Sequence, residues 1–359
     1  MQAYEAFVKE QRGQDKLSKD AFDALHRQLL DLARDLNLSF DRLQIVMETA
    51  LILGDMGKAE KARQVFSSIT APDHDDFEKE ALEILKKQPE LCPSFERLHF
   101  EEREIIIRAT GLIHFGHVYH LEGGPEIFST LKGAKISPPI LDFALFVQRC
   151  DVAGALAHRN PHHSITFTQI TYEMYEAVGK ACRILFEEGK TEIDAYKSFL
   201  SQRGEKMGLS ADIPMGQVLI RVAAMLRLFS SEEGKILQEA FSQLSSEEVK
   251  LVLKEFSAQK GILTPTYIPA VLLNLMNNEM LGAMWEERLK KAVTIGLPLI
   301  ARALEKFKAE KGNQIRACFN SLAGQAKGKE ALFLNQGTVH FDLEGNVTVT
   351  LPLQTFEIV

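Results

Sequence analysis

Apolar and charged side chains alternate at spacings of three and four residues from the N-terminus to about residue 330, a pattern typical of amphipathic helices. Residues 21–37 give the clearest example, because the apolar side chains from Phe22 to Leu36 fall on one stripe. Ser245 and Glu248 have the spacing of a capping box, which predicts a helix start. Two further helices are predicted within 41–69, broken near Gly54-Asp55-Met56-Gly57, and a pair within 265–311. Single helices are predicted at about 77–87, 95–121, 140–158, 166–189, 191–203, 214–229, 231–244 and 245–258.

The period changes to two only at the C-terminus, where 338–343 and 347–353 alternate around Glu344-Gly345-Asn346. This pattern predicts a β-hairpin with Val339, Phe341 and Leu343 on one face. An isolated hairpin is only marginally stable in water. We therefore expect it to pack on the helices, on other strands or on a second copy in a homodimer.

The predicted fold class is mainly α with a C-terminal β-hairpin. Along the chain we expect four parts: an N-terminal helical segment at 1–70, a helical core at 71–205, a C-terminal helical region at 206–330 and the hairpin at 331–359. The proportion of 45% hydrophobic and 25% charged residues in 359 is ordinary for a globular protein, so a disordered or fibrous class is excluded.

Charge and cysteine content exclude further classes. The net charge of −7 gives no general attraction to polyanions, so we expect no general nucleic-acid binding. The most apolar stretch, 140–158, holds three charged residues, and we expect no membrane span. The N-terminus lacks the pattern of a signal peptide. The four cysteines lie far apart without a CxxC pair, which favours a reducing, cytoplasmic location.

Three histidines stand at three-residue spacing in the predicted helix 95–121. On one continuous helix, His114, His117 and His120 would project from a stripe about 120° wide. Imidazole is the commonest metal ligand and also titrates near neutral pH, so the stripe is a candidate chemical site. The alternative interpretation makes His114 and His117 hydrogen-bonded interior residues and places His120 on the surface.

Asp151 is a second candidate. The predicted helix 140–158 is apolar nearly all round, so we expect it to be buried. An ionised carboxylate there must be paired or must coordinate a cation. The open alternatives are a bond to an arginine, a bond to one of the histidines, or metal coordination.

The segment Arg108–His117 resembles the central helix of the HD superfamily of metal-dependent phosphohydrolases. The family pattern is an early His, a His-Asp dyad and a late Asp on an all-α bundle. His74, His114 and Asp151 match the first His, the dyad His and the last Asp. The resemblance covers about 71–200 and implies that the core is an HD-like helical bundle with flanking helical segments.

The resemblance also implies a cofactor and a substrate class. A divalent transition metal, Mn, Fe, Ni or Zn, would be held by the three matched residues, with His117 or His120 supplying a further ligand. Such a metal lowers the pKa of a bound water, and the substrate would be a phosphate ester or a nucleotide.

Three residues follow the Asp151 helix directly: His158, Arg159 and His162. They are candidates for the substrate-binding mouth of the same pocket, with Arg159 as the phosphate contact because its planar fork matches phosphate oxygens. The alternative is a solvated turn.

Phe115 stands where the family has the dyad Asp, and a phenyl ring neither binds metal nor positions water. Three functions therefore stay open. The first is a divergent metal-dependent phosphohydrolase, and the second is a non-catalytic, HD-like regulatory or protein-interaction scaffold with a decayed metal site. The third is a helical adaptor with no link to the HD superfamily. The sequence assigns no catalytic residue.

Overall fold

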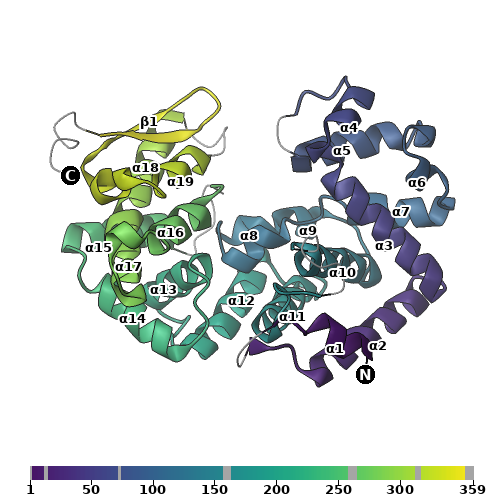
Figure 1. The fold of residues 1–359 in the computed structure, drawn as a ribbon, viewed down its shortest axis with the longest axis horizontal. Coiled ribbons are helices and arrows are strands. Elements are labelled where there is room, and N and C mark those ends of the chain that lie inside the picture. The colour runs from purple at the N-terminus through teal and green to yellow at the C-terminus, as the bar shows by residue number, and fades with distance from the viewer. Residues whose placement is uncertain are drawn as a thin grey trace. The chain divides into compact units, whose positions relative to one another are not determined.

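A computed structural model of the chain describes residues 2–11, 15–71, 74–156, 163–257, 265–311 and 317–351. Within these ranges the chain forms nineteen α-helices, short 3₁₀ turns and one two-stranded antiparallel sheet (Figure 1). The prediction of a mainly α protein with a C-terminal β-hairpin is confirmed. None of the helices in these ranges combines the length and the apolarity needed to cross a membrane.

Packing divides the chain into two compact units. Unit 1 consists of residues 1–115 and 130–179, and unit 2 consists of residues 116–129 and 180–359. The chain therefore passes from one unit to the other three times. Residues 116–129 are the part of unit 2 that is separated in sequence from the rest.

The helices of unit 1 all come from the N-terminal half of the chain. They are α1 (Gln2–Phe7), α2 (Lys19–Asp35), α3 (Phe40–Asp55), α4 (Glu60–Val65), α5 (His74–Leu85), α6 (Pro93–Glu96), α7 (Phe100–Ala109), most of α9 (Ser129–Gly133), α10 (Pro138–Gly154) and the larger part of α11 (Gln169–Ile184). Short 3₁₀ turns occur at Met56–Lys58 and Pro89–Leu91.

Local sequence explains where several of these helices begin. The hydroxyls of Ser18 and Ser39 accept hydrogen bonds from the backbone N–H of Ala21 and Arg42, which caps α2 and α3. Pro138 and Pro139 occupy the first turn of α10, where a missing N–H costs nothing.

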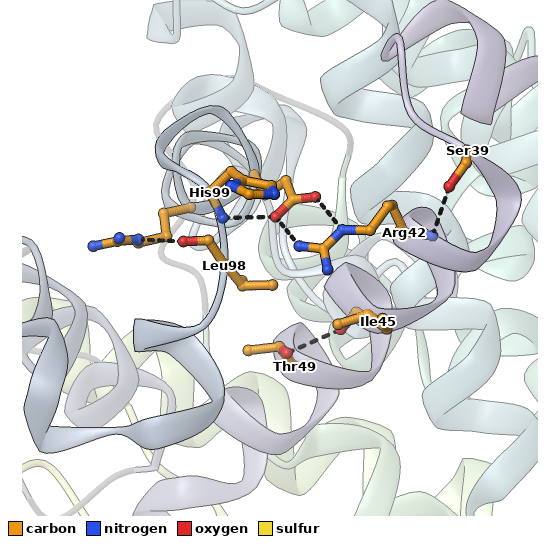
Figure 2. Close-up of polar contacts among 8 residues, drawn as sticks. Ser39, Arg42, Ile45, Thr49, Leu98 and His99 are labelled. Atoms are coloured by element: carbon orange, nitrogen blue, oxygen red, sulfur yellow. Dashed lines mark hydrogen bonds and ion pairs between the residues drawn. The ribbon is translucent and has the colours of Figure 1, made fainter.

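A charged contact joins α3 to α7 inside unit 1 (Figure 2). Arg42 donates from Nε and Nη2 to the two carboxylate oxygens of Glu102, and the Nε bond is 2.7 Å long. The backbone N–H of His99 donates to the same carboxylate at 2.7 Å and so begins α7. The hydrogen bonds from Arg42, more than that from His99, hold the pKa of Glu102 below its ordinary value of 4.5 although the group is buried.

Unit 2 contains the remaining elements. They are α8 (Phe115–His120, of which Phe115 is assigned to unit 1), α12 (Glu192–Met207), α13 (Pro214–Met225), α14 (Ser231–Phe241), α15 (Ser246–Phe256), α16 (Ile268–Met276), α17 (Trp285–Lys291), α18 (Leu297–Lys311), α19 (Asn320–Gln325), β1 (Thr338–Phe341) and β2 (Val347–Thr350). Short 3₁₀ segments occur at Pro125–Phe128, Glu279–Leu281 and Lys329–Gln336.

Capping boxes begin two successive helices of this unit. Ser230 and Glu233 bond each other's backbone N–H at the start of α14, and Ser245 and Glu248 do the same for α15. The box predicted at Ser245 is therefore confirmed.

One helical turn is widened between α17 and α18. Residues Ala292–Gly296 form a π-helical turn. Pro298 has no backbone N–H to donate to the carbonyl of Thr294, which accounts for the interruption of the regular ladder. A Cβ on Gly296 would lie 2.9 Å from the side chains of Leu272 and Leu275, so glycine permits the close packing of this turn on α16.

The C-terminal hairpin pairs Val339 with Val349 and lies against α18 and α19 (Figure 1). Gln325 of α19 bonds both backbone groups of Val349, at 2.7 and 3.1 Å. Lys306 of α18 donates to the carbonyl of Val339 at 2.6 Å. The expectation that Leu343 joins the packed face is wrong, because Leu343 lies in the turn and is 81% exposed.

Candidate functional site

The predicted histidine stripe is interrupted by a break in the helix. α7 ends at Ala109, and Gly111 adopts φ 70°, a left-handed conformation that suits glycine. His114 lies in the segment between α7 and α8, and only His117 and His120 share a helix, the short α8. The expectation of one continuous helix over 95–121 is therefore wrong.

His114 and Phe115, which were matched to the His-Asp dyad through the resemblance to the HD superfamily, differ sharply in exposure. His114 is exposed, whereas Phe115 is 6% exposed and begins α8. The apolar ring of Phe115 is thus part of the packed interior. A carboxylate at this position would have to be desolvated.

Asp151 lies near the end of α10 and is exposed, so the expectation that it is buried is wrong. Gln148 donates to its Oδ2 at 3.3 Å. The buried charge of α10 is Arg149, which forms an ion pair of 2.7 Å with Glu176 and donates to Gln28 at 2.8 Å. The apolar pattern of α10 therefore correctly indicated a buried charged residue, but that residue is Arg149 and not Asp151.

The remaining predicted residues are placed only in part. His74 begins α5, and its side chain lies outside the described residues. His158, Arg159 and His162 also lie outside the described residues. Within the ranges that the structure describes, no three His, Cys, Asp or Glu side chains come together as metal ligands do. The roles of His74, His114, His117, His120 and Asp151 as ligands stay predictions.

His117 lies beside a buried carboxylate of unit 2. Its Nε2 is 3.5 Å from Oε2 of Glu122, and both side chains are largely buried. The backbone N–H of Ile268, the first residue of α16, donates to Oε1 of Glu122 at 2.9 Å. This hydrogen bond orients the Glu122 carboxylate, which also lies beside the His117 imidazole, and it satisfies a backbone N–H at the start of α16.

Arg221 of α13 anchors the same segment. Its guanidinium donates to the carbonyls of Leu121 at 3.1 Å, Glu122 at 3.2 Å and Phe256 at 2.7 Å. Arg221 is buried, so these bonds compensate its loss of water. Leu121 itself has φ 50°, a left-handed conformation that ends α8, and its carbonyl accepts from the guanidinium of Arg221.

Two more buried polar groups surround this centre. The hydroxyl of Tyr196 donates to the carbonyl of Gly123 at 3.1 Å, and burial raises the pKa of Tyr196 to about 12. Arg203 donates to the carbonyl of Leu228 at 3.1 Å, and burial lowers its pKa to about 10. His120 Nδ1 lies 3.3 Å from the carbonyl of Ala224. The contacts of Tyr196 and His120 fasten residues 116–129 to the helices of unit 2, and the bond of Arg203 links α12 to the residue that follows α13 and its turn.

The arrangement is an imidazole next to a carboxylate that a backbone amide orients. The Glu122 carboxylate lies between the imidazole of His117 in α8 and the backbone N–H of Ile268 in α16, and it can pair with a protonated imidazole. The sequence reasoning missed Glu122 and Arg221. A signal for Arg221 was present, because it is the only charged residue in the apolar run 218–226.

Comparison with known proteins identifies a family. Residues 1–325 match the family of unknown function DUF6829, and the chain belongs to this family. No curated protein and no solved structure matches the chain.

Proposed function

We propose that this protein is a divergent, HD-like, non-catalytic scaffold that acts by binding another protein. The observation that carries the proposal is the burial of Phe115, the residue that stands where the HD superfamily has a metal-binding Asp. A phenyl ring supplies no ligand to a metal, and this ring is buried.

The surroundings of the candidate histidines support this proposal. His114 is exposed in the segment between α7 and α8, and His117 lies beside Glu122, a carboxylate already held by a backbone N–H. Contacts of this kind stabilise a fold rather than leave a ligand available for a metal.

Large apolar side chains on unit 1 support a binding role. Ile45 and Ile52 lie seven residues apart on one face of α3 and are 41% and 56% exposed. Two helical turns separate them, so they share a stripe with the exposed Glu48 between them. The two isoleucines therefore offer a partner protein apolar contacts on either side of a carboxylate.

Metal content tests the enzyme alternative, a metal-dependent phosphohydrolase acting on a phosphate ester or nucleotide. We expect the protein, purified without a histidine tag or chelator, to contain far less than one equivalent of Mn, Fe, Ni or Zn by plasma mass spectrometry. His114→Ala and Asp151→Ala should leave the metal content unchanged. Near-stoichiometric metal that either substitution removes, with hydrolysis of phosphate esters, would overturn the scaffold proposal.

The binding role is tested by substitution on α3. Proteins captured by the full chain should be lost from an Ile45→Glu/Ile52→Glu variant and retained by Val65→Glu. Val65 is an exposed apolar residue of α4 and serves as the matched control. Equal capture by both variants would contradict the role of α3.

A further inference from the structure

The exposed side of α3 carries carboxylates in register with its two isoleucines. Five of its exposed residues follow one another at spacings of four, three, four and three, and they are referred to below as the α3 stripe: Asp41, Ile45, Glu48, Ile52 and Asp55. At about 100° per residue, all five fall within an arc about 80° wide. The far side of the same helix is buried in unit 1. The α3 stripe is therefore one continuous outer surface of the helix.

The apolar and the charged side chains of the α3 stripe form two adjacent rows. With Asp41 as the origin, Ile45 and Ile52 lie at about +40° and +20° around the helix axis. On the same scale, Glu48 and Asp55 lie at about −20° and −40°. A segment that packs along α3 would therefore meet an apolar row and a row of carboxylates side by side.

The basic side chains nearest to the stripe are already paired. Arg42 is the only basic residue of α3, and its guanidinium binds the carboxylate of Glu102 in α7. Lys58, which follows the helix, pairs with Asp55. Neither cation is left to neutralise the rest of the stripe, so the surface is negative.

Two carboxylates of the stripe keep their charge available to a partner. Within the described ranges, neither Asp41 nor Glu48 forms an ion pair with a basic side chain, and Glu48 accepts a hydrogen bond of 2.8 Å from the neutral amide of Gln44. Both carboxylates are exposed to water, which screens their charge. A cationic partner that excludes this water would strengthen its own attraction to them.

The spacing and the charge of the stripe together indicate one kind of partner. Alternating steps of four and three residues are those of the a and d positions along the seam of two packed helices. The lysines and arginines that flank the seam of a basic helix would meet the carboxylates of α3. A second copy of α3 would bring carboxylates against carboxylates, and an anionic lipid surface would be repelled in the same way.

We propose that the α3 stripe binds a basic amphipathic helix of another protein. Apolar side chains of that helix pack on Ile45 and Ile52, and its lysine or arginine side chains pair with Asp41 and Glu48. This inference rests on the protein-binding role proposed above for α3 and names the class of partner.

Two synthetic peptides test the proposal with the full chain. Each has three heptads with leucine at a and d, and the e and g positions are all lysine in one peptide and all glutamate in the other. We expect saturable binding of the lysine peptide in fluorescence anisotropy and at least about tenfold weaker binding of the glutamate peptide. Equal binding of the two peptides, or no binding of the lysine peptide, would overturn the proposal.

Substitutions at constant net charge then locate the site. Asp41→Asn/Glu48→Gln should weaken binding of the lysine peptide at least about tenfold. Glu232→Gln/Glu247→Gln removes the same charge from exposed positions in the first turns of α14 and α15, and should change binding by less than about twofold. Equal weakening in both variants would show attraction to the net charge alone. Unchanged binding in the first variant, with a native circular dichroism spectrum, would also contradict the proposal.

Two further measurements with Ile45→Glu/Ile52→Glu separate this inference from the binding role itself. If that variant loses captured proteins and Asp41→Asn/Glu48→Gln retains them, α3 binds a protein but not through a basic helix. Retention by both variants would contradict the binding role and this inference with it. A native chain that sediments as a dimer, and as a monomer once the isoleucines are replaced, would assign the stripe to a second copy and overturn the basic-helix proposal.

Discussion

Both units bury an arginine, but they compensate its charge in different ways. In unit 1, Arg149 pairs with the carboxylate of Glu176. In unit 2, Arg221 donates to three main-chain carbonyls. The first arrangement depends on a side chain that a substitution can remove together with the arginine. The second depends on backbone groups that no substitution removes, so the two arginines should respond differently to mutation.

The largest effect is expected for Arg221→Met. This change leaves the carbonyls of Leu121, Glu122 and Phe256 without their charged donor in the interior of unit 2. We expect the free energy of unfolding to fall by about 3–5 kcal/mol, measured by urea denaturation. Lys235→Met, on the exposed surface of α14, is the control and should change it by less than about 0.5 kcal/mol. If the free energy of unfolding falls no more for Arg221→Met than for this control, the three hydrogen bonds of Arg221 do not stabilise unit 2.

A smaller loss of stability is expected for Arg149→Met, and a second substitution should restore part of it. The single change leaves the Glu176 carboxylate without its cation and should cost about 2–4 kcal/mol. In Arg149→Met/Glu176→Gln the remaining partner is uncharged, so the double variant should be more stable than the single one. Urea denaturation of the native chain and the two variants measures this. If Glu176→Gln lowers the stability of Arg149→Met further, Arg149 does not depend on the charge of Glu176 and the contrast with Arg221 is wrong.

The smallest effect concerns the pH dependence of the contact shown in Figure 2. Because the folded-state pKa of Glu102 lies below its ordinary value of 4.5, the contact stabilises the protein above that value. This stabilisation is lost as pH falls through the lower, folded-state pKa.

We therefore expect the thermal midpoint of the native chain to exceed that of Glu102→Gln at pH 7. The gap should narrow as pH falls from about 5 to 3. Differential scanning calorimetry across this interval measures both proteins. A gap that stays constant over the interval would contradict the sign of the pKa change.

The sequence predicted the regular parts of the fold well, because local rules determine them. The stripe from Phe22 to Leu36 became α2, and the box of Ser245 with Glu248 begins α15. The strict alternation after Thr338 became the hairpin. Each of these features depends on neighbours within about four residues or on one adjacent strand.

The candidate site was harder to predict, because it depends on long-range packing. Gly111 was a local sign that the helix before His114 ends. No local sign existed for Glu122, the partner of His117, because the backbone N–H that orients its carboxylate belongs to Ile268, 146 residues later. For α10, a helix that is apolar nearly all round does not show which of two nearby charges faces outward. The structure buries Arg149 and exposes Asp151.

The position of residues 116–129 has a consequence for synthesis. This segment leaves the ribosome well before the rest of unit 2, and its anchor Arg221 follows Leu121 by 100 residues. Until then the carbonyls at the end of α8 have no guanidinium to bind. Unit 2 is therefore completed late in translation, and no single cut of the chain releases either unit whole.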